Sequence, residues 1–406
     1  MSDGHGCVVV VNCGSSSVKL ALVDPRTGRR PVSILGERLG SDDAVLHVST
    51  ADGKRSLAPG RSDHAGVLAE ALPFLTGAGI DLLGVGHRVV NGGARYSASV
   101  PVTDRVLADI RELSALAPLH NPANAAGIDA ARAVLPDLTH VAVFDTAFHQ
   151  TMPPVAYRYA VPGAWFSDLG VRRYGAHGTS HRYVSARAAE LLEASGRSVN
   201  GLRLVVAHLG NGCSATAVLG GRSVDTTMGL TPLEGLVMGT RSGDVDAGVL
   251  DLVARRTGAD VHEIVRQLNS ESGLLALSGL SNDVRTLTEQ AGAGHSGARL
   301  ALDVFVYRAA KHVAALTVPL GGLDALVLTG GVGENAVPVR SALLARLSHL
   351  GLREDPALNA DHGRGSDPRG RITEPDPTDP AAPLAMVVPT DEELLIARDT
   401  VALVPA

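Results

Sequence analysis

Two segments of the chain share one pattern of apolar and polar positions. Residues 8–24 read VVVVNCGSSSVKLALVD, and residues 204–221 read LVVAHLGNGCSATAVLGG. Each passes from an apolar strand through a turn of small residues into a second strand, which is typical of a hairpin with a glycine-bearing loop. The pattern therefore predicts two similar halves that open with the same hairpin.

Further along the chain, apolar runs alternate with helical spacing. Residues 323–331 (LDALVLTGG) predict a strand that ends in a glycine-rich turn, followed by one helix over 333–350. Helical spacing also occurs at 104–117, 183–195 and 297–316. This mixture of strands and helices indicates an α/β protein with mixed sheets.

The last part of the chain changes character twice. Residues 355–383 hold six prolines among many polar residues and predict irregular surface chain. Residues 387–404 (VVPTDEELLIARDTVALV) predict a strand, a cap at Thr390 or Asp391, and a closing helix.

Composition excludes several classes of protein. At 406 residues, with 45% apolar and 19% charged side chains, the chain is an ordinary globular protein of two or three domains. Its net charge of −6 argues against nucleic acid or an anionic membrane as the main partner. Its 1 Trp, 6 Tyr and 5 Phe offer few surfaces for stacking bases.

The apolar runs and the cysteines narrow the setting. No apolar run reaches the length of a membrane span, and the run at the N-terminus is too short for a signal-peptide core, so we expect a cytoplasmic protein. The cysteines are Cys7, Cys13 and Cys213, which have no metal-ligand spacing. If Cys7 and Cys13 share a strand, they lie ~20 Å apart and cannot pair, so we expect buried free thiols.

The first hairpin turn carries groups that bind phosphate. NCGSSSVK (12–19) combines an amide, hydroxyls and one of only three lysines. Its backbone N–H groups with Ser15, Ser17 and Lys19 would hold phosphate oxygens, while Asn12 would help to hold Mg²⁺. The alternative is an ordinary Ser/Gly turn, and GxxxxGK[ST] is absent.

Two more glycine turns follow apolar strands. They are HLGNG (208–212) and GGVGEN (330–335), neither of which matches GxGxxG within an early βαβ unit. Each is weak alone, because glycine turns are common. Together with the first turn, however, they favour a nucleotide held by several backbone loops. The chain has an unusually high count of 46 glycines, and these turns account for some of them.

Charged and polar residues lie in the same glycine-rich surroundings. Arg88 (GHRVVNGG) and Arg241 (MGTRSGD) are placed where a guanidinium usually has an anionic partner. Asp145 follows the apolar run VAVF, and His177 and His181 lie in RYGAHGTSHRYV. A solvated arginine, a capping aspartate and structural histidines are the alternative interpretations.

Taken together, these motifs resemble the acetate kinase family, within the superfamily that contains actin and the hexokinase-type sugar kinases. The matching segments run in the family's order from residue 12 to residue 400: NCGSSSVKL, GHRVVNGG, LAPLHNPAN, FDTAFHQTMP, RYGAHGTSHRYV, HLGNG, TTMGLTPLEGLVMGTRSGDVD, TGGVGEN and VPTDEELLIARDT.

The resemblance implies two similar actin/hexokinase-like (ribonuclease H-like) domains with mixed sheets around an interdomain cleft. It implies an acyl- and phosphate-binding domain at 1–152 with a returning helix at 387–406, and a nucleotide-binding domain at 153–386. The implied activity is acetate kinase, a homodimer that reversibly transfers the γ-phosphoryl of ATP to acetate. Acetyl phosphate and ADP are the products, and Mg²⁺, or alternatively Mn²⁺, is required.

The resemblance also implies roles for individual residues. It gives catalytic roles to Asp145, His177 and Arg241, and a metal site to Asn12 and Glu392. It places the acyl substrate against Arg88, Val90, Leu119 and Pro232. It surrounds the nucleotide with Lys19, His208, Leu209, Gly210, Asn211, Gly212, Asp283, Val284, Arg285, Gly331, Val332, Gly333, Glu334 and Asn335.

Physical chemistry sharpens one of these roles. A carboxylic acid with a pKa of about 4 is already ionised at neutral pH, so the attacking oxygen has no proton to lose. We therefore expect Asp145 to orient Mg²⁺ or its waters instead of acting as a general base. The transfer then depends on positioning and positive charge.

Four positions depart from the family pattern. Ala176 stands where the family has a phenylalanine of the acyl pocket, which predicts a relaxed preference for acetate over propionate. Val284 replaces a phenylalanine and offers less surface to an adenine. Cys213 and Asn91 replace a serine and a histidine, and the sequence alone gives no account of either.

Two other functions remain open at this point. A propionate or butyrate kinase is the alternative within enzymes, because Val90 narrows the acyl pocket while Ala176 opens it. A non-catalytic nucleotide-binding regulator of the same fold is the alternative outside enzymes.

Overall fold

The computed structural model describes residues 6–14, 16–77, 79–118, 120–362, 370–379 and 381–405. The chain folds into two compact units. Unit 1 comprises the chain up to Gln150 together with the chain from Asp391 onward, and unit 2 comprises Thr151–Thr390. Among the described residues, no helix has both the length and the apolarity that a membrane span requires.

Unit 1 is an α/β structure with one eight-stranded sheet in the order β5-β4-β3-β2-β1-β6-β8-β7. Its elements are β1 Cys7–Cys13, β2 Ser17–Val23, β3 Val32–Glu37, β4 Val45–Thr50, β5 Gly53–Leu57, α1 His64–Thr76, β6 Leu82–Val89, β7 Val100–Pro101, α2 Asp104–Glu112, α3 Asn121–Val134, β8 His140–Phe144 and α15 Glu392–Leu403. Strand β1 (CVVVVNC) is almost entirely buried, as expected of a β-branched strand covered on both faces.

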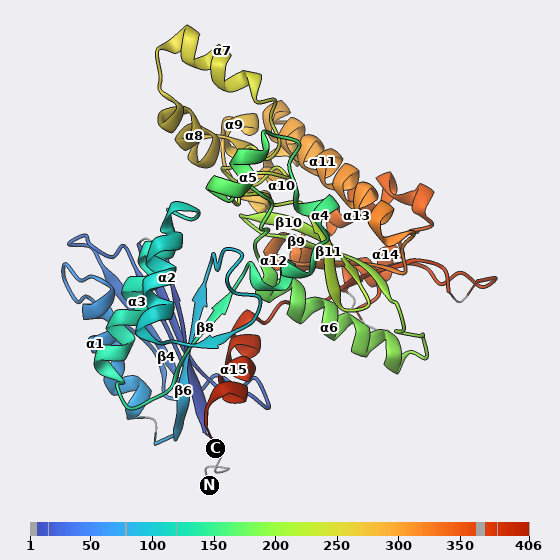
Figure 1. The fold of residues 1–406 in the computed structure, drawn as a ribbon. Helices are drawn as coiled ribbons and strands as arrows, with labels where there is room; N and C mark the ends of the chain where they lie inside the picture. Colours follow the sequence, from blue (N-terminus) through green and yellow to red (C-terminus); the bar gives the residue numbers. More distant parts are fainter. Residues whose placement is uncertain are drawn as a thin grey trace. The chain divides into compact units, whose positions relative to one another are not determined.

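Different helices cover the two faces of this sheet (Figure 1). Side chains of β1 at Val9 and Val11 pack in one apolar cluster with residues of α1 and α3. On the opposite face α15 lies against the bare backbone of β6, since a Cβ on Gly86 would lie 2.5 Å from Cγ2 of Ile396. Glycine in β6 therefore lets the last helix of the chain approach the sheet closely.

Unit 2 has a five-stranded sheet in the order β11-β10-β9-β12-β13. Its elements are α4 Pro154–Tyr157, α5 Gly163–Leu169, α6 Gly178–Ala194, β9 Arg203–Leu209, β10 Cys213–Leu219, β11 Arg222–Thr226, α7 Gly248–Thr257, α8 Val261–Ser270, α9 Gly273–Ser278, α10 Val284–Gly292, α11 Ser296–Leu320, β12 Ala325–Thr329, α12 Gly330–Asn335, α13 Val337–Arg346, α14 Pro356–Ala360 and β13 Leu384–Val387. The main apolar cluster joins α11 to one face of the sheet.

The two sheets share a topology. In unit 1, β1 pairs antiparallel with β2 and parallel with β6. In unit 2, β9 pairs antiparallel with β10 and parallel with β12. The expected hairpins therefore occupy equivalent places, and the predicted α/β class with two similar mixed sheets is confirmed.

The predicted helix over 333–350 is wrong in its extent. The structure divides this stretch into α12 and α13, with Ala336 between them in a non-helical conformation. Pro338 explains the break, because its ring would clash with the carbonyl four residues earlier in a continuous helix. The glycine-rich segment GGVGEN, expected as a turn, forms α12.

Other local predictions have mixed outcomes. The irregular stretch 355–383 contains the short helix α14, which begins after Asp355. Asp391 caps α15, since its carboxylate accepts a hydrogen bond from the N–H of Leu394 at 2.9 Å. Cys7 and Cys13 lie on β1, and all three cysteines are buried and free, as expected.

Candidate active site

Four of the candidate side chains of unit 1 gather on the face of the sheet that α15 covers. In β1 and β6, Val10 pairs with Gly86 and Val11 with His87, so Asn12 and Arg88 follow as the next neighbours. Because side chains alternate between faces, both point to the face on which Gly86 meets α15. Glu392 is the first residue of that helix.

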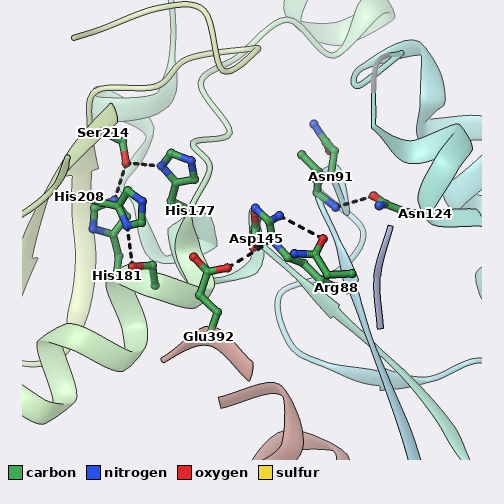
Figure 2. Close-up of polar contacts among 12 residues, drawn as sticks. Arg88, Asn91, Asn124, Asp145, His177, His181, His208, Ser214 and Glu392 are labelled. Atoms are coloured by element: carbon green, nitrogen blue, oxygen red, sulfur yellow. Dashed lines mark hydrogen bonds and ion pairs between the residues drawn. The ribbon is translucent and has the colours of Figure 1, made fainter. Parts of the chain in front are cut away.

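Arg88 is the centre of this group, which we call the Arg88 cluster: Asn12, Arg88, Asp145 and Glu392. Its Nη2 lies 2.6 Å from Oδ2 of Asp145, and its Nε lies 3.6 Å from Oε2 of Glu392. Its Nη1 donates to Oδ1 of Asn12 at 3.4 Å. Figure 2 shows the two carboxylates beside the guanidinium. One cation therefore holds two acids together.

Burial and charge act on this cluster in opposite directions. Burial disfavours the charge of Arg88, but Asp145 and Glu392 outweigh it and raise the pKa of the guanidinium. Burial raises the pKa of the Glu392 carboxyl, and Arg88 opposes this effect only in part. The cluster is thus an electrostatically strained group of oxygen ligands that a further cation would stabilise.

Asparagines fix the backbone beside Arg88. Oδ1 of Asn124 accepts from the N–H of Val90 at 3.0 Å, and its Nδ2 donates to the carbonyl of Cys13 at 2.8 Å. Oδ1 of Asn91 accepts from the N–H of Gly93 at 2.7 Å, which accounts for the departure at residue 91 as a turn-forming asparagine. The sequence analysis missed Asn124, which lies in the quoted segment LAPLHNPAN.

In unit 2, His177 and Arg241 converge on one glycine. A Cβ placed on Gly212 would lie 3.5 Å from Nε2 of His177 and 3.5 Å from Nη1 of Arg241. Because glycine has no side chain, a guanidinium nitrogen and an imidazole nitrogen face the position that a Cβ would occupy. We call this space the Gly212 gap.

Arg241 has no carboxylate partner among the residues that the structure describes. Its Nη1 donates to the carbonyl of Pro232 at 3.2 Å, and burial lowers the pKa of its guanidinium. Its loop is held in place because the N–H of Gly239 donates to the carbonyl of Asn211 at 2.9 Å. A half-buried, firmly held guanidinium without an acid among the described residues is suited to bind an anion.

Unit 2 also contains a hollow of about 680 Å³ between the loop after β9, helix α12 and helix α10. It is lined by Gly210, Asn211, Asn282, Asp283, Val284, Arg285, Thr288, Glu289, Gly331, Val332, Asn335, Ala336 and Pro338. Asp283 shapes one wall, since its Oδ1 caps α10 by accepting from the N–H of Arg285 at 2.7 Å. The hollow has the dimensions of a small-molecule site.

Most of the residues expected at the nucleotide line this hollow, and several do not. His208, Leu209, Gly212, Gly333 and Glu334 lie outside its lining. Oε1 of Glu334 instead accepts from the N–H groups of Gly330 and Thr390, at 3.0 and 3.2 Å. Glu334 therefore holds the loop in shape.

Other predicted residues lie elsewhere or outside the described part of the chain. Lys19 is exposed on β2, where it pairs with Asn12. Leu119 and Ser15 lie outside the described residues. The sequence analysis missed Asn282, Thr288 and Glu289, although the helical spacing of Val284, Thr288 and Glu289 could have indicated that they share a helix.

Two more of the four substituted positions, besides Asn91, have a structural account. Cys213 is buried beside Gly210, whose carbonyl accepts from the thiol at 3.1 Å, and burial raises the pKa of Cys213 to about 12. The thiol is therefore unreactive. Val284 lies 8% exposed in the apolar cluster, so it contributes little surface to the hollow.

Comparison with known proteins identifies the class of protein to which the chain belongs. Residues 7–398 match the model of the Acetokinase family. The chain is 54% identical over 400 residues to an acetate kinase of Deinococcus radiodurans, covering 98% of both chains. A propionate kinase of Francisella tularensis has a TM-score of 0.91 at 41% identity, covering 98% of this chain and 100% of its own. An acetate kinase of Porphyromonas gingivalis has a TM-score of 0.88 at 40% identity, with the same coverage.

The fold and these relatives define a phosphotransferase, a kinase with a carboxyl group as acceptor. The chain belongs to the acetokinase family. The family resemblance drawn from the sequence motifs is thereby confirmed.

Proposed function

We propose that the protein catalyses the acetate kinase reaction, ATP + acetate ⇌ ADP + acetyl phosphate. The observation that carries this proposal is the convergence of His177 and Arg241 on the Gly212 gap, next to the loop residues Gly210 and Asn211 that line the hollow. A γ-phosphoryl group in that gap would meet two donors, and its nucleotide would extend into the hollow.

In the proposed step, a carboxylate oxygen of acetate attacks the γ-phosphorus of ATP in line with the leaving oxygen. One P–O bond forms to acetate, the bond to the β-phosphate oxygen breaks, and ADP keeps the electron pair. Acetate is already ionised, so no base is needed. Arg241 and His177 stabilise the equatorial phosphoryl oxygens by donating hydrogen bonds to them.

Mg²⁺ is the metal that this reaction would require, and the chemistry of the Arg88 cluster fits it. The cluster offers two carboxylates and one amide oxygen, which are hard ligands of the kind that Mg²⁺ prefers. Among the described residues, no group of three or more His, Cys, Asp or Glu could hold a metal. This fits a metal that completes its coordination with water and phosphate oxygens.

We propose that Asn12, Asp145 and Glu392 hold Mg²⁺, or Mn²⁺ in its place, and that Arg88 orients both carboxylates. The metal supplies charge neutralisation of the phosphate oxygens when bound. Asp145 then acts by fixing Arg88 and the metal ligands. The catalytic set consists of Asp145, His177 and Arg241, with Arg88 contacting the anionic substrate.

The nucleotide assignment divides the chain by function. We propose that unit 2 binds ATP and ADP in the hollow, chiefly through backbone N–H groups of the loop after β9 and of the start of α12. Unit 1 carries the residues assigned to the acyl substrate and the metal. The proposed domain boundaries are 1–152 with 387–406, and 153–386.

The acyl preference is set by few positions. We propose that Val90 in unit 1, and Pro232 and Ala176 in unit 2, contact the methyl group or the chain of the acid, together with Leu119. Val90 is 7% exposed and Ala176 is 4% exposed. The missing phenyl at residue 176 leaves room that propionate would use, so acetate and propionate are both proposed substrates.

A hydroxamate assay with ATP, Mg²⁺ and acetate tests the proposed reaction directly, because hydroxylamine traps acetyl phosphate. We expect product with acetate and a smaller amount with propionate. Absence of product with any short acid would contradict the kinase and favour a nucleotide-binding regulator. Gly212→Ala should lower kcat because its methyl group fills the Gly212 gap, whereas Gly163→Ala, where a Cβ meets nothing within 4 Å, should not.

We also propose a cytoplasmic homodimer. Helices α7 and α8 expose Leu252, Val261 and Val265, which are 52%, 53% and 38% exposed. No residue of α7 is buried. A second copy of the chain would cover this apolar surface. Light scattering of the eluting protein gives the mass, and a mass of one chain at micromolar concentration would refute the dimer.

A further inference from the structure

Two serine hydroxyls and three histidine rings lie in contact at the start of α6 in unit 2. Oγ of Ser214 lies 2.9 Å from Nδ1 of His177 and 2.7 Å from Nε2 of His181. A second hydroxyl, Oγ of Ser180, lies 2.8 Å from Nδ1 of His208. Ser214 is fully buried. Figure 2 shows Ser214 and the three imidazoles together.

The backbone explains why one hydroxyl reaches two imidazoles. His177 and His181 stand four residues apart at the start of α6, so they lie on one side of that helix. On β10, Cys213 and Ala215 pack into the apolar cluster with α11, so Ser214 points to the opposite face, where it pairs with His208 of β9.

The hydrogen bond from Ser214 decides where the other edge of His177 points. With Nδ1 directed to Ser214, Nε2 lies beside the Gly212 gap and Nη1 of Arg241. His177 is also one of the few non-glycine residues with a positive φ, at 56°. Such a conformation costs about 1 kcal/mol or more and persists only when the surroundings hold it.

We propose that Ser214 is a positioning residue for phosphoryl transfer. Its hydroxyl donates a hydrogen bond to Nδ1 of His177. This hydrogen bond keeps the proton of a neutral His177 on Nε2. The inference rests on the proposed function, in which His177 donates a hydrogen bond to the phosphoryl group.

The count of protons is compatible with this direction, and the proposed role of His177 as a donor to the phosphoryl group requires it. A serine hydroxyl donates one hydrogen bond and accepts two. If Nε2–H of His181 donates to Ser214, the hydroxyl proton remains for Nδ1 of His177, and Nε2 of His177 becomes a donor. If Ser214 accepted from His177 instead, a neutral His177 would present a lone pair to the phosphoryl oxygens and would repel them. Nδ1 of the His208 ring lies 2.8 Å from Oγ of Ser180.

Ser214→Ala tests the proposal because it removes both hydrogen bonds without adding volume. We expect kcat to fall at least about tenfold, the effect of one hydrogen bond to a charged group, with little change in the KM for ATP. Ser214→Cys, whose thiol is a weak donor, should restore part of the loss. Thr216→Val is the matched control, since it removes another fully buried hydroxyl from the same face of β10, one whose hydrogen bond is to the hydroxyl of Thr226 at 2.8 Å.

Two measurements separate positioning from a merely structural role. Ser214→Ala should lower kcat in the original protein but not in a protein that already carries His177→Gln. If the two substitutions lower kcat additively, the proposal is overturned. The tautomer of His177 is read from ¹⁵N-histidine spectra, in which its signals are assigned by comparison with His177→Gln. In the original protein the ring proton of His177 should lie on Nε2. In Ser214→Ala it should shift toward Nδ1. An unchanged tautomer would overturn the proposal even if the hydroxamate assay had shown no kinase activity.

Discussion

Arg88 and Asp145 form a buried, two-point ion pair, in which Nη2 lies 2.6 Å from Oδ2 and Nε lies 3.3 Å from Oδ1. The Asp145 side chain is fully buried, while 20% of the Arg88 side chain remains exposed. Strand β6 supplies the arginine and the end of β8 supplies the aspartate. The pair therefore joins two parallel strands at their carboxyl ends.

Removal of Asp145 should destabilise the protein as well as inactivate it. Asp145→Ala leaves Arg88 with only the more distant Glu392, so we expect a loss of about 3 kcal/mol in the free energy of unfolding. Urea unfolding measures this loss. The matched control is Asp129→Ala, which breaks the exposed Arg111–Asp129 pair and should change stability by less than about 0.5 kcal/mol. Equal losses would contradict the special role of burial.

Arg241 should matter for turnover and much less for stability. Arg241→Ala removes a donor from the Gly212 gap and should lower kcat at least about 100-fold, or roughly 2.7 kcal/mol. Arg241→Lys should recover little, because one ammonium cannot reproduce the planar fork of the guanidinium. The exposed Arg255→Ala serves as the control. Near-normal turnover of Arg241→Ala would remove this residue from the catalytic set.

Ala176 should determine how steeply activity falls with acyl length. We expect kcat/KM to decrease only modestly from acetate to propionate, and more steeply toward butyrate. Ala176→Phe should steepen the first decrease, since one methylene in an apolar pocket is worth about 1 to 3 kcal/mol. Initial rates with the three acids provide the comparison. A steep decrease in the original protein would show that residue 176 does not enlarge the pocket.

The stability of unit 1 should depend on pH through two buried histidines. His87 and His140 stack in contact, with Nε2 of His87 2.9 Å from Nδ1 of His140. Burial, with a contribution from His140, lowers the pKa of His87 well below its usual value, and burial also lowers the pKa of His140. Both remain neutral in the folded protein at a pH at which the unfolded chain binds protons.

Stability should therefore be constant above about pH 7 and decrease as the pH falls below about 6.5, where histidines of the unfolded chain become protonated. The slope is at most about 1.4 kcal/mol per pH unit for each histidine. Urea unfolding from about pH 7.5 to 5.5 measures it. His87→Gln should flatten the dependence of the free energy of unfolding on pH. The control His262→Gln, at an exposed histidine, should leave that dependence unchanged. A flat pH dependence in the original protein would contradict the prediction.

The sequence predicted β1, β2, β9, β10 and β12 because their apolar runs stand out, whereas it gave no prediction for other strands such as β3, β4 and β5. It predicted α12 poorly, since glycines disfavour a helix. The helix forms because Oε1 of Glu334 accepts from the N–H of Gly330 and from that of Thr390 at 3.0 and 3.2 Å. That second contact joins residues far apart in the chain, and no local pattern reports it.

The candidate site was predictable where the motif carries the chemistry. Arg88, Asp145 and Arg241 stand in distinctive segments, and the structure gives each a geometry suited to anions or a metal. Ser214 was not predictable, because its contact with His177 depends on the register of β9 and β10 and on the placement of α6. Such supporting contacts are properties of the fold and not of any segment.

The return of the chain to unit 1 through α15 has a consequence for synthesis. The ribosome makes β1 to β8 before unit 2, but the helix that covers one face of their sheet, and that carries Glu392, emerges after unit 2. Unit 2 is a single continuous stretch and is complete before that helix exists. The sheet of unit 1 is thus begun before unit 2 and completed after it, and a chain that ends before Asp391 would lack the helix that covers Gly86 of β6.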